Sequence, residues 1–517
     1  MSTSRVSLRR QPCAGRLRGS HPADGRRWGT KLHLHPDSKI AALSITALVL
    51  TAITVSFASF ASGALADTGL PAPVGEAPAT LPFSFLQANF QAIDVTAAWR
   101  PFTWDTARAL PVDVNNIAMK RINGVLYDHP VDQAQCGLSS LSAFRLTAND
   151  VYLAHAKAQA DHLIGYRVAS SGAWFYPYRF RWNNLNPPWY SAMAQGMVLA
   201  LFARLYEVTG DATYKDAADR TFQSFLVAPN TNGPWIVEVD GQRYLRLEEY
   251  PKSAYEFVFN GHIFAAFGLC DYYRVTGDAR ALALYRGALT AGAHYAPLIR
   301  NPGWISAYSL GVRSTYAHYH AVHIAELLEL YTVSGWQGFA EFADQFSQDY
   351  PSPKLNGTIH VAAGRLTGYR FAANGTITGT RLLNLGRAAT MEVTSRARVR
   401  GRAGYWFSVT TGSLAGYCLV EVAGRIYYPG AVARLTYRPA RRMRIRAGLI
   451  TGATYDAHGR VTGQRTVRLT TPDVATISER ATIDGYPLVH IATGRLAGYW
   501  IASTALTSPA ALGTDTP

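Results

Sequence analysis

The chain has 517 residues, 48% of them hydrophobic, which is enough for a large core in two or three domains and excludes wholesale disorder. Its net charge of +16 is uneven: residues 1–40 carry +7, residues 41–350 carry −5 and residues 351–517 carry +14. The charge of the last third of the chain can therefore attract polyanions. In the slightly acidic centre, an attraction for polyanions must be argued from individual residues.

The N-terminal region has the pattern of an export signal. Residues 40–66 carry no charge, follow a basic stretch and end in Ala64-Leu65-Ala66, an A-x-A cleavage pattern. We therefore predict a signal peptide over residues 1–66, followed by a linker over 67–81. The uncharged run is long enough to span a bilayer, so an uncleaved signal anchor is the alternative. In both cases we expect an exported protein, secreted or held at the cell surface.

The four cysteines, Cys13, Cys136, Cys270 and Cys418, show no paired spacing such as C-x-x-C. This pattern indicates neither a zinc knuckle nor a disulfide scaffold. A Cys136–Cys270 bridge would be compatible with export, but we expect two buried free thiols instead.

A plan of polar residue, apolar helix and turn occurs four times between residues 135 and 335. The opening residues are Gln135, Gln195, Asn260 and His320, at intervals of 60, 65 and 60 residues. The turns contain Gly or Asn, which takes the left-handed position after a helix, and an Asp that can cap the next helix often follows. The interval is longer than the ~33–47 residues of common solenoid repeats, so we predict an incomplete α/α toroid over residues 82–352.

In a toroid the inner helices run roughly parallel, so their N-terminal ends gather at one end. We therefore expect Gln135, Gln195, Asn260 and His320 to surround one cleft as substrate-binding residues, with positive helix ends pointing at it. Such a cleft suits a carboxylate-bearing ligand. The alternative is that these residues only cap their helices.

Two loops entering this cleft carry residues that can do chemistry. The loop before the third inner helix reads Leu247-Glu-Glu-Tyr-Pro251, and the loop before the fourth contains Trp304-Ile-Ser-Ala-Tyr308. On the fourth helix, Tyr316, Tyr319, His320 and His323 are spaced to share a face that can stack on sugar rings and donate hydrogen bonds. Ordinary packing with satisfied hydroxyl groups is the alternative. His320-x-x-His323-x-x-Glu326 has metal-ligand spacing, but no further ligand cluster supports it, and we expect no metal.

At this point the sequence resembles a known family. Between residues 110 and 350 it carries Gly172-Ala-Trp174-Phe-Tyr176-Pro, Pro187-Pro-Trp-Tyr-Ser-Ala-Met-Ala-Gln195-Gly, Glu248-Glu-Tyr-Pro251, Val258-Phe-Asn-Gly261 and Tyr319-His-x-x-His323-Ile. This ordered set is similar to the C-terminal catalytic region of D-glucuronyl C5-epimerases. The resemblance implies an α/α toroid that inverts C5 of glucuronyl units in heparosan-type chains without a redox cofactor.

The resemblance also implies residue roles. The family's catalytic tyrosines match Tyr250, Tyr308 and Tyr319, and its assisting glutamate matches Glu249, which would orient a tyrosine or act as base. Inversion needs one group on each face of the sugar to take and give the C5 proton. Tyrosines suit both tasks if their pKa values are lowered.

For substrate binding we expect His320 and His323 to hold the carboxylate or the neighbouring sugar, with Trp174 and Tyr176 completing the set. One departure concerns an arginine: the family's Tyr-Asp-Leu-Arg is here Tyr308-Ser-Leu-Gly311. The arginine expected to bind the carboxylate is missing, and Arg313 is the candidate replacement. The polysaccharide therefore stays open between heparosan and a bacterial uronic-acid polymer.

From Asn356 short β-like runs and many glycines replace the helical pattern. Gly364-Arg-Leu-Thr-Gly recurs as Gly448-Leu-Ile-Thr-Gly after 84 residues, and Gly412-Ser-Leu-Ala-Gly-Tyr recurs as Gly494-Arg-Leu-Ala-Gly-Tyr after 82. We predict two tandem β modules, over 356–430 and 440–508, whose endings resemble small SH3-like modules of exported bacterial wall enzymes. With their positive charge they would hold an anionic polymer or the cell wall. A structural β cap is the alternative, and nucleic acid is not an expected partner.

The favoured function is C5-epimerisation of glucuronyl residues in a uronic-acid polysaccharide. A lyase begins with the same removal of the C5 proton, so the tyrosines do not exclude it. A glycoside hydrolase needs two facing carboxylates, for which Glu248 or Glu249 with Glu256 is a poor match. A polysaccharide-binding protein that kept the toroid without activity is the third alternative, suggested by the missing arginine.

Overall fold

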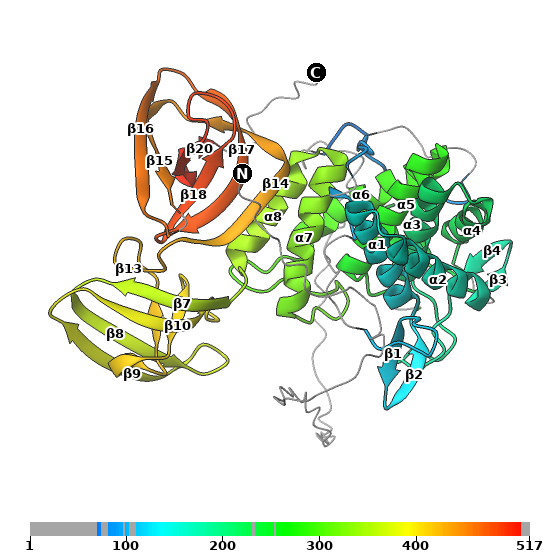
Figure 1. Cartoon of the computed structure of the whole chain (residues 1–517), viewed down its shortest axis with the longest axis horizontal. Coiled ribbons are helices and arrows are strands. Elements are labelled where there is room, and N and C mark those ends of the chain that lie inside the picture. Colours follow the sequence, from blue (N-terminus) through cyan, green and yellow to red (C-terminus); the bar gives the residue numbers. More distant parts are fainter. Residues whose placement is uncertain are drawn as a thin grey trace, which may run out of the picture.

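A computed structural model describes residues 70–73, 81–96, 99–102, 110–229, 233–252, 255–456 and 458–507. The expected signal peptide or anchor over residues 1–66 lies outside these ranges, as does most of the expected linker. Within them, no helix combines the length and the apolar character needed to cross a membrane. The described chain forms a helical domain followed by two large β-sheets (Figure 1).

Eight α-helices of the described chain form four hairpins, each with an inner helix followed by an outer one (Figure 1). The pairs are α1 (Pro130–Thr147) with α2 (Asp150–Tyr166), α3 (Ala192–Thr209) with α4 (Ala212–Phe222), α5 (Phe259–Thr276) with α6 (Ala279–Ile299), and α7 (Ala317–Ser334) with α8 (Gln337–Asp349). Gly210, Gly277 and Gly335 end α3, α5 and α7 at φ values of 68°, 71° and 70°. Asp211 and Asp278 cap α4 and α6. The predicted turn chemistry thus sets the helix boundaries.

The inner helices α1, α3, α5 and α7 pack in chain order, with the outer helices behind them (Figure 1). Helices α3 and α5 approach closely because glycines lie at their contact. A Cβ built on Gly268 would lie 2.0 Å from the Gly196 carbonyl oxygen, and one built on Gly196 would lie 2.4 Å from the Ala265 Cα. The result is an arc of helical hairpins, as expected for an incomplete α/α toroid.

Short hairpins occupy three of the connections that lead into the inner helices. They are β1 (Met119–Ile122) with β2 (Val125–Asp128), β3 (Val168–Ser170) with β4 (Ala173–Phe175), and β5 (Val237–Val239) with β6 (Leu245–Leu247). The 3-10 helix η2 (Gln223–Leu226) follows α4. These connections gather at the end of the domain where the inner helices begin, which is the end at which the sequence places the cleft.

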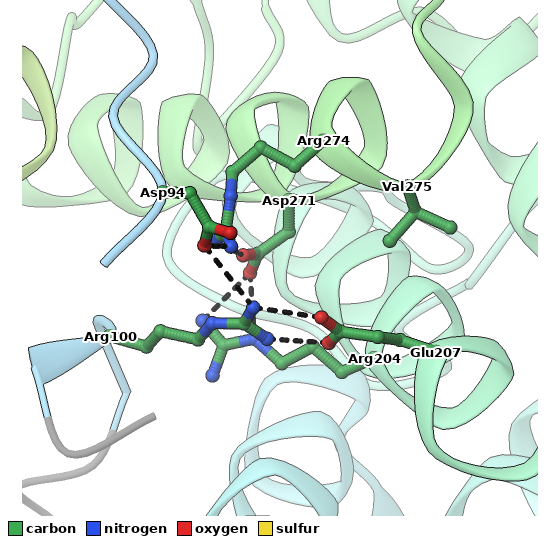
Figure 2. A pocket seen from close by; sticks show the side chains of 7 residues that line it. All are labelled: Asp94, Arg100, Arg204, Glu207, Asp271, Arg274 and Val275. Atoms are coloured by element: carbon green, nitrogen blue, oxygen red, sulfur yellow. Dashed lines mark hydrogen bonds and ion pairs between the residues drawn. The ribbon is translucent and has the colours of Figure 1, made fainter. Parts of the chain in front are cut away.

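The opposite end of the inner helices holds a network of ion pairs (Figure 2). Arg204 on α3 donates to Asp271 on α5 at 2.8 Å, and Arg100 from the N-terminal segment donates twice to Glu207, at 2.5 and 2.8 Å. Arg274 pairs with Asp94 of the same segment. Because Arg100 and Arg204 are buried, loss of a partner would leave an uncompensated charge. The network therefore fastens Asp94 and Arg100 to the helical domain.

The last third of the chain forms two antiparallel seven-stranded sheets. The strands of the first are β7 (Lys354–Val361), β8 (Gly364–Phe371), β9 (Ile377–Leu385), β10 (Ala389–Ala397), β11 (Trp406–Val409), β12 (Cys418–Val420) and β13 (Ile426–Tyr427), with η3 (Gly412–Leu414) between β11 and β12. Those of the second are β14 (Ala431–Ile445), β15 (Gly448–Tyr455), β16 (Val461–Leu469), β17 (Asp473–Ile483), β18 (Tyr486–Ile491), β19 (Trp500–Ala502) and β20 (Leu506–Thr507), with η4 (Ser503–Ala505) before β20.

The two sheets have the same strand order. The first runs β13-β7-β10-β11-β12-β8-β9, and the second, read from its other edge, runs β20-β14-β17-β18-β19-β15-β16. Each strand of one sheet therefore has a counterpart in the same place in the other. We call the two units module 1 (β7–β13) and module 2 (β14–β20).

The modules attach to the helical domain in different ways. Tyr437, Met443 and Ile445 of module 2 belong to the same buried apolar cluster as the inner helices. Module 1 instead has its own apolar core, which includes Ile359 and Phe407, and Arg398 and Tyr405 join it to the end of α8 by hydrogen bonds to the Gln348 carbonyl. Module 2 is thus packed as part of the helical domain, while module 1 leaves polar surface between itself and the helices.

Candidate active site

Two connections into inner helices are hydrogen-bonded to each other at the predicted cleft. The N–H of Phe259 donates to the Tyr308 carbonyl at 3.3 Å, and the N–H of Leu310 donates to the Phe257 carbonyl at 3.3 Å. Val258 and Ser309 form an antiparallel bridge between the same segments. The loop that carries Tyr250 is therefore held against the loop that carries Tyr308, although 58 residues separate them.

The four residues expected to do the chemistry lie together. The phenol oxygens of Tyr250 and Tyr308 are 3.2 Å apart, and the Tyr308 hydroxyl donates to Oε1 of Glu249 at 3.3 Å. The rings of Tyr308 and Tyr319 pack with their centroids 4.4 Å apart. Two phenols and a carboxylate thus form one hydrogen-bonded chain beside a third phenol.

Glu249 is placed for proton transfer by its surroundings. Its side chain is buried next to the first turn of α5, where a Cβ built on Gly261 would lie only 2.4 Å from Oε2. Among the described residues, Oε2 has no hydrogen-bond partner. Burial raises the pKa of Glu249 to about 7, against the lowering effect of hydrogen bonds from Tyr250 and Tyr308. This carboxyl group can therefore both take and give a proton near neutral pH.

The pKa values of the two phenols Tyr250 and Tyr308 are raised and not lowered. Burial, followed by the charge of Glu249, raises the pKa of both Tyr250 and Tyr308. The condition of lowered pKa values is not met, because the hydroxyl groups are buried and the structure brings a carboxylate, and not a cation, next to them. The phenols are therefore neutral hydrogen-bond donors in this structure, and Glu249 is the group that titrates.

Trp189 of the Pro187-Pro-Trp-Tyr motif packs beside Tyr250. The Trp189 ring stacks on Tyr178 at a centroid distance of 3.9 Å and meets Tyr250 at 5.9 Å. Trp189 and Tyr178 are both buried. The motif had been noted only as part of a pattern, and the structure shows that its tryptophan supports a residue of the tyrosine cluster.

Comparison with known proteins bears on the same part of the chain. Residues 168–348 match the model of the D-glucuronyl C5-epimerase C-terminus. This part of the chain is similar to the C-terminal region of that family. A D-glucuronyl C5-epimerase of Caenorhabditis elegans is 32% identical over 89 residues, which cover 17% of this chain and 14% of the enzyme. An uncharacterized protein of Methanocaldococcus jannaschii is 29% identical over 163 residues, 31% of this chain and 53% of that protein.

The chain thus spans about half of the archaeal relative and a smaller share of the nematode epimerase. Among solved structures, it is similar to cellobiose 2-epimerase from Bacillus thermoamylovorans, with a TM-score of 0.33 and 14% identity over 43% of this chain and 59% of that one. It is also similar to unsaturated glucuronyl hydrolase from Bacillus sp. GL1, with a TM-score of 0.32 and 16% identity over 43% and 62% of the two chains.

Three of the substrate-binding residues expected from the sequence have partners within the protein. Gln195 is fully buried: its amide donates to the Trp174 carbonyl at 2.8 Å, and its carbonyl accepts from the N–H of Tyr176 at 3.0 Å. The Tyr176 hydroxyl is buried against Thr221 at 2.7 Å, and Trp174 packs under the Arg167 guanidinium. The substrate role predicted for Gln195 and Tyr176 is therefore not supported by their geometry, because both are enclosed by protein partners.

His320 is likewise enclosed. Its Nδ1 lies 2.8 Å from the Ser306 hydroxyl and its Nε2 lies 2.9 Å from the Phe346 carbonyl. Since both ring nitrogens have partners and the residue is buried, His320 anchors the loop before α7 to α8. The predicted contact of His320 with substrate does not fit this arrangement.

His323 is fully buried, and only one of its two ring nitrogens has a hydrogen-bond partner among the described residues. Its Nδ1 is 2.9 Å from the Ser306 hydroxyl, while Nε2 has no partner among the described residues. Burial lowers the pKa of His323 to about 3, so the ring is neutral. Asn260 is also buried, with an Oδ1 that lacks a described partner, and so is Gln135, with a free Nε2.

The structure shows that there is little space for a side chain at the position where the epimerase pattern has arginine. Gly311 stands where the family has arginine, and its N–H donates to the Glu256 carbonyl at 3.1 Å. A Cβ built on Gly311 would lie 3.2 Å from the Glu256 Cα, which leaves little room for a side chain. Arg313 does not replace it: its exposed side chain donates to the Leu298 carbonyl at 3.1 Å and to Asn301.

One acidic residue of the site was considered in the sequence only as a metal ligand. Glu326 of α7 is fully buried, and neither carboxyl oxygen has a partner in the described structure. Burial, with the charges of Glu329 and Glu249 nearby, raises the pKa of Glu326 well above its ordinary value. No group of three or more His, Cys, Asp and Glu side chains in the described ranges is placed to hold a metal ion. The i, i+3 spacing on α7 predicted that Glu326 lies on the same face as His320 and His323. The sequence did not show that Glu249, from the loop before α5, lies near it.

Cys136 and Cys270 are both buried, and no disulfide joins them.

Proposed function

We propose that this protein inverts C5 of glucuronyl residues in a uronic-acid-containing polysaccharide. The observation that carries the proposal is the hydrogen-bonded chain Tyr250–Tyr308–Glu249, with Tyr319 packed against Tyr308. The match of residues 168–348 to the D-glucuronyl C5-epimerase C-terminus supports it. The C5 hydrogen is weakly acidic because the carbanion left after its removal is stabilised by the adjacent carboxylate. Inversion follows when a proton returns to the opposite face of the ring.

The raised phenol pKa values define how the protons would move. Ionised Glu249 accepts the Tyr308 phenol proton while the phenol oxygen takes the C5 proton, so Tyr308 stays neutral and Glu249 becomes protonated. Tyr250 then donates its proton to the other face of C5. The contact between Tyr250 and Tyr308 lets the proton held by Glu249 return along the chain, which leaves the protein unchanged after one turnover.

Stabilisation of the developing charge would come from the same hydroxyl groups. Removal of the C5 proton places negative charge on the uronate carboxyl oxygens, which then accept stronger hydrogen bonds. Neutral phenols in a buried site are suitable donors, because they stabilise that charge without a cation at Gly311. The family's missing arginine therefore does not by itself remove the means of catalysis.

Hydrogen exchange at C5 tests the proposal. In heavy water, the wild-type protein should introduce deuterium at C5 of a glucuronyl polymer such as heparosan and form iduronate-like units, both visible by NMR. Tyr308→Phe and Tyr319→Phe should reduce the exchange by at least ~100-fold, the typical contribution of a general acid or base, with unchanged circular dichroism. Full exchange in both variants would show that these tyrosines are not the proton-transfer groups.

A lyase is the second candidate, because the same base would start elimination. It would break the C4–O bond after the C5 proton leaves and produce unsaturated ends that absorb in the ultraviolet. Growth of that absorbance during the heavy-water experiment would assign the site to elimination. Its absence together with C5 deuterium would support epimerisation.

The β region and the export signal complete the proposal. We infer that modules 1 and 2 are two copies of one β unit, since their strand orders agree, and that their positive charge attracts an anionic polymer or the cell wall. An exported or surface-held enzyme would meet its polysaccharide outside the cytoplasm. Retention of the full chain by purified wall at low salt, lost at high salt, is the expected outcome.

A further inference from the structure

A cavity lies between module 1 and the loop that carries Tyr308. The cavity has a volume of about 430 Å³, within the ~300–1,000 Å³ usual for ligand pockets. Trp304 lines it from the helical side, four residues before Tyr308. Arg370 and Arg398, from β8 and the end of β10, and Arg400 beyond them line it from module 1. None of the described lining residues is acidic.

The three arginines are not neutralised within the protein. Arg370 donates to the Gly416 carbonyl at 3.2 Å and lies over the Tyr417 ring at 4.3 Å. Arg398 donates to the Gly404 and Gln348 carbonyls, and its buried Nε has no partner among the described residues. In the described structure, no carboxylate forms an ion pair with Arg370, Arg398 or Arg400. Carbonyl partners leave the positive charges available to an anion.

Trp304 adds an apolar surface to this charge. Arg400 lies 6.0 Å from the Trp304 ring centre, and the edge of Tyr350 packs against the same ring at 5.3 Å. An indole ring packs well against the apolar face of a sugar, while guanidinium groups hold carboxylates in a planar, paired geometry. Together these groups fit a sugar acid better than a small inorganic ion.

The wall of the cavity on the helical side is fixed in place. Asp349 at the end of α8 accepts from Arg300 at 2.6 Å and from the N–H of Gly303 at 2.7 Å. Arg398 and the Tyr405 hydroxyl of module 1 both donate to the Gln348 carbonyl, at 2.8 and 2.9 Å. Loop and module are therefore tied to the same turn of α8, so the cavity is formed before a ligand arrives.

We propose that this cavity is a distal subsite for the acidic polysaccharide whose glucuronyl unit occupies the tyrosine cluster. The proposal rests on the proposed function, and it deepens that function by naming how a long chain is held. Because Trp304 and Tyr308 share one loop, a polymer leaving the tyrosines along this loop reaches the arginines after a short run of sugars. Arg370, Arg398 and Arg400 would bind its carboxylates, and Trp304 would stack on one ring.

Binding and turnover of the full chain test the proposal with heparosan polymer and a heparosan tetrasaccharide as probes. Arg400→Ala and Arg370→Ala should each weaken polymer binding, measured by calorimetry at low salt, by about tenfold, the loss typical of one charge-assisted contact. Arg387→Ala, an exposed arginine in the loop between β9 and β10, removes the same charge at the far end of the β8–β9 hairpin and should change binding less than twofold.

Turnover separates this inference from the proposed function. The two cavity variants should raise KM for C5 exchange on the polymer by the same factor, with kcat and all tetrasaccharide parameters unchanged. If wild type exchanges C5 hydrogen but the variants bind and turn over polymer like wild type, the subsite is wrong and the function stands. If no protein exchanges C5 hydrogen, the function fails, and polymer binding still tests the cavity. Binding of poly(glycerol phosphate) but not heparosan would assign the cavity to a phosphate polymer and overturn the proposal.

Discussion

At the scale of single residues, the position of Glu249 depends on the absence of a side chain at Gly261. The carboxylate fills the space that a Cβ on Gly261 would occupy, with Oε2 2.4 Å and the Glu249 Cβ 2.8 Å from the built atom. Gly261 has no left-handed conformation to satisfy, so the demand for glycine comes from the carboxylate alone. The glycine at the start of α5 therefore leaves the space that the Glu249 carboxylate occupies.

Gly261→Ala should separate activity from stability. The added methyl group must displace Glu249, so we expect kcat for C5 exchange to fall at least tenfold. Stability should change little, because alanine favours the helix by ~1 kcal/mol and offsets part of the crowding. NMR measurement of deuterium incorporation, with thermal unfolding in parallel, gives both quantities.

The matched control is Gly165→Ala near the end of α2, where no atom lies within 4 Å of the built Cβ. It should leave activity unchanged. A Gly261→Ala protein with wild-type kcat would mean that the position of the Glu249 carboxylate does not limit catalysis.

Glu248, which precedes Glu249 in the chain, gives a pH-dependent prediction. It is fully buried, its Oε2 accepts from the N–H of Phe257 at 3.2 Å, and its Oε1 has no described partner. Burial raises the pKa of Glu248 from 4.5 to about 7. The folded protein thus keeps a proton that the unfolded chain releases above pH 4.5, so this group's stabilising effect is lost as the pH rises through 7.

Glu248→Gln cannot release that proton. Its unfolding free energy relative to wild type should therefore rise by about 3 kcal/mol between pH 4.5 and pH 8, the linkage value of a shift from 4.5 to 7. Urea unfolding followed by tryptophan fluorescence at several pH values measures this difference. Glu392→Gln, on the exposed face of β10, should run parallel to wild type. Parallel curves for Glu248→Gln as well would contradict the prediction.

The sequence predicted which residues form the tyrosine cluster, but not the hydrogen-bond partners of the polar groups around it. Tyr250, Tyr308, Tyr319 and Glu249 were recognised because a family motif marks them, and the structure brings them together. Gln195, by contrast, was assigned to substrate, whereas it binds the backbone at Trp174 and Tyr176. A buried amide forms hydrogen bonds with whichever polar group the fold brings near it. For Gln195 these groups belong to a segment about twenty residues earlier in the chain.

At the scale of elements, the turns between helices were readable because their chemistry is local. A left-handed Gly followed by a capping Asp needs no distant partner, so Gly210-Asp211 and Gly277-Asp278 revealed both hairpins. The bridge between Val258 and Ser309 could not be read in this way. It depends on the distance between α5 and α7, which is set by packing and not by either loop.

Helix α7 also has contacts that its sequence did not predict. Its spacing put His320, His323 and Glu326 on one face, and all three are indeed buried. The spacing did not show that His320 would turn to Ser306 and Phe346 while Glu326 kept both oxygens free of described partners. The buried polar side of α7 therefore combines a structural anchor with groups that lie close to Glu249.

At the scale of the whole molecule, Asp344 on α8 joins module 2 to the helical domain. Its carboxylate accepts from Arg441 at 2.6 Å, pairs with Arg480 at 3.3 Å, and accepts from the Tyr437 hydroxyl (module 2, Figure 1). Arg441 is 1% exposed. The apolar cluster of the inner helices continues into module 2 around this ion pair. We therefore expect module 2 and the helices to unfold as one unit, whereas module 1 has its own core.

Asp344→Asn should break that unit. It leaves the buried Arg441 without a counter-charge, a loss of ~3–5 kcal/mol for a buried pair. Calorimetry should then show module 2 unfolding before the helical domain, with activity on a tetrasaccharide retained below that transition. Glu341→Gln, also on α8 and without an ion pair among the described residues, should unfold like wild type.

A second substitution distinguishes the ion pair from general damage to α8. In Asp344→Asn with Arg441→Met the buried charge is removed together with its partner, so much of the lost stability should return, because a methionine of similar volume needs no counter-charge. If the double variant is as unstable as Asp344→Asn alone, the charge of Arg441 is not the cause. The attachment of module 2 would then depend on the shared apolar cluster, and truncation of Met443 or Ile445 would be the substitution that separates the two.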